Sequence, residues 1–148
     1  MNNIFSIKYL RDLVNYWFPP IIWMIIIFPT NDYLSSKNTS NIIIPLILII
    51  FPDIDNSILN FIHFIIRKMF HFFNYLFLAF LLYRAFTKGR KTWYLKGMII
   101  TVIISAMYAI MDELIQTIIP SRTGTFYDFI IDISGCVFLF GIVYLKYK

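Results

Sequence analysis

The chain has 148 residues, of which 59% are hydrophobic and only 14% are charged. This length gives room for one domain, and the composition excludes an ordinary soluble protein because several apolar runs approach the roughly 20 residues that cross a bilayer. The formal net charge of +5 does not indicate nucleic-acid binding, since the basic residues stand mainly at the ends of apolar runs and not in a polar patch.

Four membrane-spanning helices are predicted, and we treat residues 1–148 as a single domain. The first run is short and contains adjacent prolines, but no small-residue cleavage site follows it, so we expect it to be an uncleaved span. The predicted fold class is therefore an all-α integral membrane bundle of about four transmembrane helices. The four runs are Leu13 to Phe28, Met69 to Phe86, Trp93 to Met111 and Phe126 to Leu145.

A further apolar run, Asn41 to Phe51, lies between the first two predicted spans. It has about ten usable apolar residues and an internal proline, Pro45, so it is too short to cross a bilayer of ordinary thickness. We expect an interfacial or re-entrant segment here.

The basic residues predict the orientation of the chain. Lys and Arg are retained on the cytoplasmic side of membrane proteins. Most of them fall on one set of helix ends, so both termini are predicted to be cytoplasmic in a multi-pass protein of the cell membrane. The residues of this set are Lys8, Arg11, Arg84, Lys88, Arg90, Lys91, Lys96, Lys146 and Lys148.

A polar stripe precedes and enters the second span. Its members recur at spacings of three and four residues, which is the period of one helix face. Asp55 is a plausible N-cap for this helix. A helix from there to Phe86 would be about 46 Å long, against a hydrocarbon core of about 30 Å, so its first half should lie along the outer interface. The stripe consists of Asn56, Asn60, His63, Arg67, His71 and Asn74.

Three polar residues, Asp112, Glu113 and Gln116, end the predicted third span. Their spacing places them together at one end of a helix. They could simply mark the point where the helix meets water, but the apolar residues that follow, including Leu114 and Ile118, argue against a solvated end. Acids at a helix C-terminus also oppose the helix dipole, which favours a functional role with a compensating cation or proton.

Two more acids begin the fourth span. Thr125 and Asp128 have the spacing of a capping box, so Asp128 has a structural alternative as part of a helix cap. Asp132 lies one turn further in and should face a protein interior or a polar cavity, because a carboxylate at that depth is costly. Asp132 is therefore a functional candidate.

His71 and three basic residues complete the candidate site. A neutral imidazole beside a carboxylate can act as a general base. Arg67 and Lys68 could bind phosphate or merely anchor at the headgroup level, and Arg122 lies in a turn beside the N-terminus of the fourth helix, a favourable place for a phosphate anion. The predicted topology brings these groups to one level, in a single outward-facing pocket.

Two segments resemble the motifs of the VanZ-like family of membrane proteins, named for a teicoplanin (glycopeptide) resistance protein. They are RKMFHFFNYLFLAFLLYRA and MDELIQTIIPSRTGTFYDFIIDISG, and the likeness extends over nearly the whole chain. Two positions depart from the family pattern: Asn74 stands where Glu is usual, and Ile115 where His is usual. If either family residue is needed for proton transfer, this member is altered or inactive.

The resemblance implies chemistry on a phosphate-linked lipid headgroup, because the family is similar at a distance to enzymes that exchange such headgroups. The expected partners are membrane lipids or a polyprenyl-linked cell-wall precursor, and the expected activity is that of a headgroup transferase or hydrolase. Seven candidate residues fall on family motif positions: His71, Asp112, Glu113, Gln116, Arg122, Asp128 and Asp132.

Two functions remain open at this point. In the enzyme hypothesis His71, Asp112, Glu113, Gln116 and Asp132 are catalytic, and Arg67, Lys68 and Arg122 bind the substrate. The acids either orient His71 or hold a divalent cation, with Asp128 and Asp132 as ligands for Ca²⁺ or Mg²⁺. In the alternative, the same pocket belongs to a non-catalytic protein that binds a cell-wall lipid precursor or an antibiotic and alters susceptibility.

Overall fold

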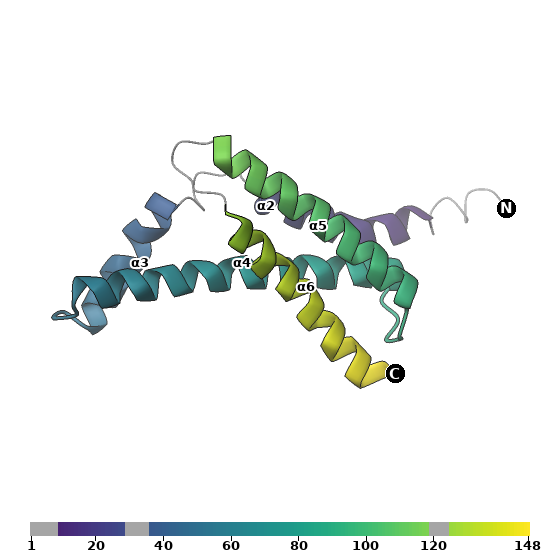
Figure 1. The fold of residues 1–148 in the computed structure, drawn as a ribbon. Coiled ribbons are helices and arrows are strands. Elements are labelled where there is room, and N and C mark those ends of the chain that lie inside the picture. Colours follow the sequence, from purple (N-terminus) through teal and green to yellow (C-terminus); the bar gives the residue numbers. More distant parts are fainter. Residues whose placement is uncertain (1–8, 29–35, 119–124) are drawn as a thin grey trace.

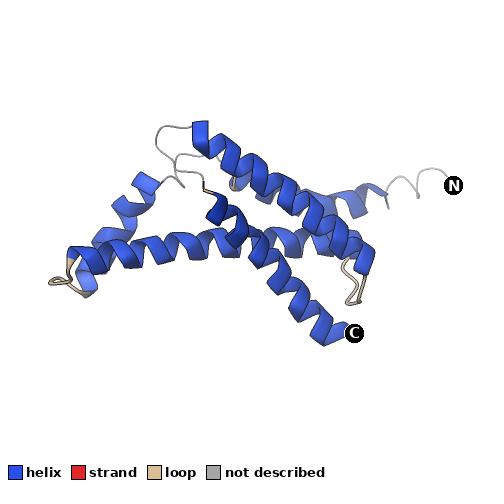
Figure 2. Ribbon diagram, viewed as in Figure 1, coloured by secondary structure: helices blue, strands red, loops and turns tan. Residues whose placement is uncertain are grey.

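The computed structural model describes residues 9–28, 36–118 and 125–148, and every regular element within these ranges is a helix (Figure 1). Figure 2 shows short loops at residues 51–55 and 88–94. The predicted all-α fold class is confirmed. The elements are a π-helix (Leu13–Trp17), α2 (Phe18–Ile26), α3 (Ser36–Ile50), α4 (Asn56–Thr87), α5 (Leu95–Ile118) and α6 (Phe126–Tyr147).

Helix α4 is the longest element, and α5 and α6 both pack against it (Figure 1). Its 32 residues correspond to about 48 Å at 1.5 Å per residue, so the predicted interfacial half continues into the predicted second span without a break. Asp55 is the N-cap, as predicted, and accepts a hydrogen bond from the Ser57 backbone N–H at 2.7 Å. Hydrogen bonds from the Ser57 hydroxyl and N–H lower the pKa of Asp55 from its ordinary value.

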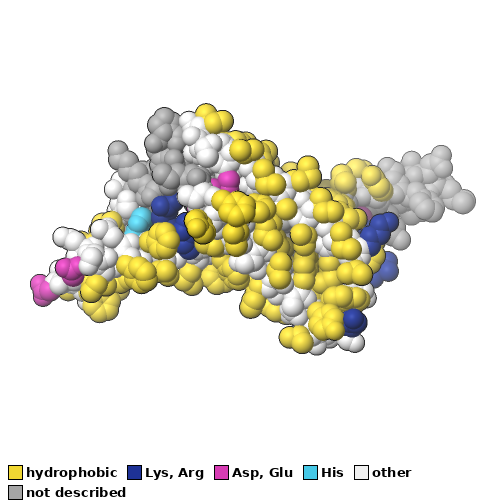
Figure 3. Space-filling model, viewed as in Figure 1, with side chains coloured by type: hydrophobic (Ala, Val, Ile, Leu, Met, Phe, Trp, Pro, Cys, Tyr) yellow, Lys and Arg dark blue, Asp and Glu magenta, His cyan; other side chains and the backbone are white. Residues whose placement is uncertain are grey.

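Helices α4, α5 and α6 are long and apolar enough to cross a membrane. Large apolar side chains cover much of their outer surface, as Figure 3 shows for one face. Apolar surface of this extent in contact with water would be unfavourable, whereas lipid chains accommodate it. The protein is therefore a membrane protein.

The first predicted span does not form one continuous α-helix. Helical structure runs through residues 9–26, with a π-helical turn in the middle, and α2 itself has nine residues. This segment is not among the three helices long enough to cross a membrane. The apolar run at 41–51 forms most of α3, a helix of 15 residues with Pro45 inside it, which packs against α4.

The predicted end of the third span is wrong by two turns. Helix α5 continues past Met111 to Ile118, so the polar residues at 112, 113 and 116 lie within its last two turns and do not mark the point where it stops. These three side chains are buried, whereas Leu114 and Ile118 are exposed. The reason is that the polar face turns toward the other helices while the apolar face continues the lipid-facing surface.

The α4–α6 crossing is very close at Gly135. A Cβ atom at this position would lie 2.4 Å from the carbonyl oxygen of Phe72 and 3.0 Å from the backbone nitrogen of Leu76. Only glycine permits this approach of the two backbones, as small residues do in other membrane helix pairs. The contact fixes the rotation of α6, and therefore the direction in which Asp132, almost one turn earlier, points.

Two hydrogen bonds attach α2 to the other helices. The indole N–H of Trp23 donates to the backbone carbonyl of Asn74 on α4 at 3.1 Å, and the Tyr108 hydroxyl on α5 donates to the carbonyl of Met24 at 2.5 Å. Buried apolar residues of α4, α5 and α6 form the core beside them, among them Leu78 and Ala109. The N-terminal helix is thus fastened at the level of the core.

Candidate functional site

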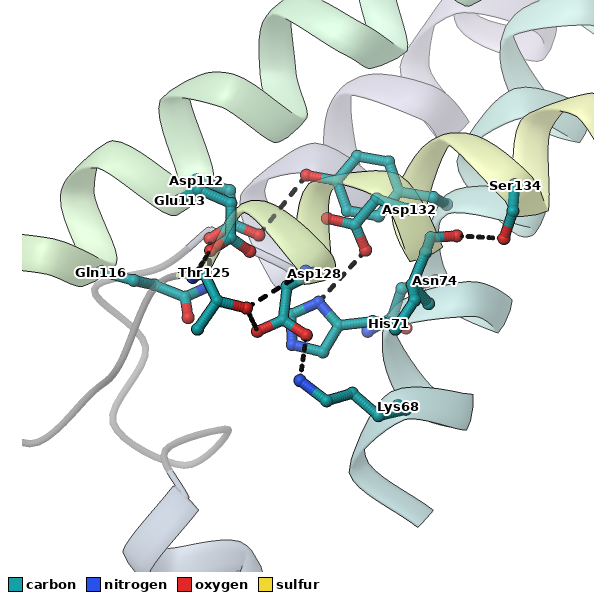
Figure 4. A network of polar contacts seen from close by, with 12 residues as sticks. Lys68, His71, Asn74, Asp112, Glu113, Gln116, Thr125, Asp128, Asp132 and Ser134 are labelled. Carbon is teal, nitrogen blue, oxygen red and sulfur yellow. Dashed lines mark hydrogen bonds and ion pairs between the residues drawn. The ribbon is translucent and has the colours of Figure 1, made fainter. Parts of the chain in front are cut away.

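Three helices bring a group of polar side chains together beside the α4–α6 crossing (Figure 4). The contributing segments are the middle of α4, the last turns of α5 and the first turns of α6. Charged residues inside a membrane protein are costly and commonly mark a functional site. The side chains are Lys68, His71 and Tyr75 from α4, Asp112, Glu113 and Gln116 from α5, and Thr125, Asp128 and Asp132 from the start of α6.

His71 and Asp132 form the most enclosed contact of this group. Nδ1 of His71 lies 3.1 Å from Oδ1 of Asp132, and the Asp132 side chain has no exposed surface. In the neutral tautomer with Nδ1 protonated, the ring donates to the carboxylate and leaves Nε2 free to accept a proton. The second oxygen of Asp132, Oδ2, has no hydrogen-bond partner among the described residues.

Asp128 combines two roles that the sequence leaves as alternatives. Its carboxylate forms an ion pair with Lys68 of α4, and it also accepts a hydrogen bond from the Thr125 hydroxyl at 2.9 Å. The Asp128 side chain is 2% exposed, against 19% for Lys68. Asp128 therefore belongs to the cap of α6 and at the same time joins α6 to α4.

Thr125 caps α6, as predicted, but its own backbone N–H has an unexpected acceptor. The Thr125 hydroxyl accepts from the Asp128 N–H at 3.2 Å. In a capping box the third-position acid would accept from the N-cap N–H; here that donor goes to Oε2 of Glu113 at 2.7 Å. Glu113 thus couples the end of α5 to the start of α6, while its other oxygen, Oε1, has no partner among the described residues.

Replacing Thr125 with valine should destabilise the folded protein by about 1 kcal/mol, because the cap oxygen and the hydroxyl donor to Asp128 are both lost. The free energy of unfolding in detergent, followed by circular dichroism, measures this loss. Thr117→Val is the control. Among the described residues the Thr117 hydroxyl contacts only the Leu114 carbonyl, on an exposed part of α5, so this substitution should change stability by less than about 0.5 kcal/mol. Equal effects of the two substitutions would contradict the role of the cap.

Asp112 is held by two neutral donors. The side-chain amide of Gln116 donates to Oδ1 at 2.8 Å, and the Tyr75 hydroxyl donates to Oδ2 at 3.4 Å. Tyr75 was not predicted as a site residue. The available signal was its position four residues after His71, which places both side chains on one face of α4.

His71, Glu113 and Asp132 form a compact donor group. One potential ligand atom from each residue lies within 4.8 Å of the other two, so these residues could hold a metal ion. Asp128, predicted as a metal ligand, is not in this group because its carboxylate faces Lys68. The Ca²⁺ or Mg²⁺ site at Asp128 and Asp132 remains a prediction.

The other predicted binding residues are less fully placed. Arg67 is half-buried and makes no hydrogen bond or ion pair with the described residues. Arg122 lies outside the described residues. The two family departures do not interrupt the contacts above: Asn74 accepts the Trp23 bond through its backbone, and Ile115 is half-buried on α5.

A model of the VanZ/LLP1 family matches residues 16–147, which is nearly the whole chain. The chain belongs to the VanZ/LLP1 family. This confirms the resemblance drawn from the two motifs and supplies no reaction by itself. Searches of curated proteins and of solved structures found no match. The function of this VanZ/LLP1 protein must therefore be argued from its own site.

Proposed function

We propose that this protein acts at the outer leaflet of the cell membrane on the phosphate-linked headgroup of a lipid, with His71 as the general base. The observation that carries this proposal is the 3.1 Å contact between His71 Nδ1 and the fully buried Asp132 carboxylate. Asp132 holds the ring in one tautomer, so Nε2 can accept the proton of a water molecule or a headgroup hydroxyl. The deprotonated oxygen then attacks phosphorus, the P–O bond to the leaving alcohol breaks, and the leaving oxygen takes back the proton that His71 holds.

Lys68 is the best-placed residue for the phosphate group. Its ammonium group keeps some exposure while it pairs with Asp128. A lysine has three N–H donors, so it can retain this ion pair and still donate to a phosphate oxygen. Arg67, one residue earlier, and Arg122 are proposed as additional phosphate ligands, since a guanidinium group binds phosphate in a bidentate manner.

The distribution of basic residues supports an outward-facing site. Lys88, Arg90 and Lys91 lie in the loop after α4, and this end also holds the start of α5 and the C-terminus (Figures 1 and 3). The candidate site lies toward the opposite ends of α5 and α6. The positive-inside preference then assigns the basic end and both termini to the cytoplasm, and the site to the outer half of the membrane.

The departures at Asn74 and Ile115 do not remove the proposed base or its partner. His71, Asp132 and Lys68 are all present and in contact with their partners, and neither departure replaces one of them. The protein is therefore proposed to be active. If its substrate is a polyprenyl-linked cell-wall precursor, the activity would change the target of glycopeptides such as teicoplanin and alter susceptibility to them.

The test is headgroup turnover by the purified protein in vesicles. Phospholipids and polyprenyl phosphates with labelled headgroups are supplied separately, with water or a free headgroup alcohol as the acceptor. Release or exchange of label from at least one class, absent in protein-free vesicles, is the expected result. Binding of labelled lipid without turnover of any class would overturn the enzyme proposal and favour the non-catalytic binding protein.

A further inference from the structure

Two buried carboxylate oxygens in the candidate site lack a hydrogen-bond partner among the described residues. They are Oε1 of Glu113 and Oδ2 of Asp132. Both residues are buried, and Asp132 has 0% exposure. A buried carboxylate oxygen without a partner is unfavourable by several kcal/mol unless a cation or a proton compensates it. Both atoms are therefore places where a cation or a proton would compensate the buried carboxylate.

The balance of charge around these atoms gives the same indication. Besides Asp112, three carboxylates of the site are buried: Glu113, Asp128 and Asp132. Among the described residues the lysine in contact with them is Lys68, and it pairs with Asp128. Even a protonated imidazole would add only one further positive charge. The described part of the site thus keeps an excess of negative charge within membrane-spanning helices, where such charge is costly.

We propose that His71, Glu113 and Asp132 bind one divalent transition-metal cation, with Zn²⁺ as the expected tightest ligand and Mn²⁺ as a weaker one. Each residue offers one donor atom within 4.8 Å of the others. Nitrogen and oxygen donors at 2.0–2.2 Å from a tetrahedral zinc ion lie about 3.3–3.6 Å apart, roughly 1 Å closer than the 4.8 Å limit of this group. Small side-chain rotations are therefore enough to close the site.

The donor set favours this class of ion over Ca²⁺ and Mg²⁺. Those hard cations take oxygen ligands, whereas an imidazole nitrogen suits zinc and its neighbours. His71 is thus the residue that determines the class. The metal site itself does not depend on the proposed function. If that function holds, His71 would be a ligand of the bound ion, and the ion would supply the activation of the attacking hydroxyl that His71 supplies as general base in the metal-free protein.

Metal binding is measured on the full chain in detergent, independently of turnover. After treatment with a chelator, the protein is dialysed against Zn²⁺ or Mn²⁺, and bound metal is counted by mass spectrometry. Wild type should bind about one equivalent, and a large excess of Ca²⁺ or Mg²⁺ should not displace it. Glu113→Gln and Asp132→Asn should each weaken binding by at least about 100-fold, since even residues that only orient a ligand contribute 10–100-fold.

Asp112→Asn is the matched control, because Asp112 is a buried carboxylate beside Glu113 that lies outside the donor group. It should bind metal like wild type. Co²⁺ provides a second readout: its visible absorption should change on binding and should be lost in His71→Ala, which identifies the imidazole as a ligand. Folding of every variant is checked by size-exclusion chromatography. If Asp132→Asn does not fold, the metal affinity of Glu113→Gln tests the site by itself.

Two results would overturn the metal site. One is less than stoichiometric metal in folded wild type, and the other is unchanged affinity in Glu113→Gln. A protein that binds metal with this residue dependence but turns over no lipid would contradict the proposed function and leave the metal site standing. His71-dependent turnover by a metal-free protein would contradict the metal site and leave the general-base proposal standing.

Discussion

Replacing His71 with alanine should lower headgroup turnover by about 10²–10⁴-fold, the usual contribution of a positioned general base. The substitution removes the only described imidazole in contact with a buried carboxylate. Asp132→Asn should also lower turnover, because an amide can hold the ring but does not stabilise the imidazolium that forms when His71 takes a proton. Initial rates in vesicles, with labelled headgroup and saturating lipid, measure both effects.

His63→Ala is the matched control for this experiment. His63 lies on the same helix, two turns before His71, and its Nε2 atom has no hydrogen-bond partner among the described residues. Within the described part of the chain, His63 makes no hydrogen bond or ion pair with the acids of the site, so its removal should leave turnover within about twofold of wild type. A His71→Ala protein that folds normally and turns over lipid at the wild-type rate would exclude His71 as the base.

The sequence alone predicts the long helices, two helix caps and the burial of Asp132. The lengths of the apolar runs predict the three long helices, because the length needed to cross a membrane depends on bilayer thickness and not on how the helices pack. The caps at Asp55 and Thr125 were also predictable, because the bond runs between neighbours in the chain. The depth of Asp132 within its helix correctly indicated a carboxylate that faces the protein interior.

The partners of these residues could not be predicted in the same way. Which carboxylate faces His71, and which faces Lys68, depends on how α4 and α6 are rotated about their axes. That rotation is set by packing between residues distant in sequence. The predicted length of α5 is wrong for a related reason. From the sequence alone, polar residues that are buried against other helices cannot be distinguished from polar residues that mark the end of a membrane span.

Replacing Gly135 with alanine should destabilise the protein by about 3 kcal/mol, at the upper end of overpacking effects. The added Cβ would meet the Phe72 carbonyl oxygen at 2.4 Å and the Leu76 nitrogen at 3.0 Å. Both are backbone atoms of a long helix, so no side chain can rotate away and the two helices must separate. Turnover should fall as well, because Asp132, almost one turn before Gly135, would move away from His71.

Gly141→Ala is the control on the same helix, because a Cβ there has nothing within 4 Å. Alanine loses less backbone freedom than glycine on forming a helix, so this change should leave stability unchanged or raise it by up to about 1 kcal/mol. The two substitutions are chemically identical, and their opposite signs would isolate the close α4–α6 approach as the cause. Unfolding by SDS titration measures both, and a Gly135→Ala protein as stable as Gly141→Ala would show that this crossing does not set the geometry of the site.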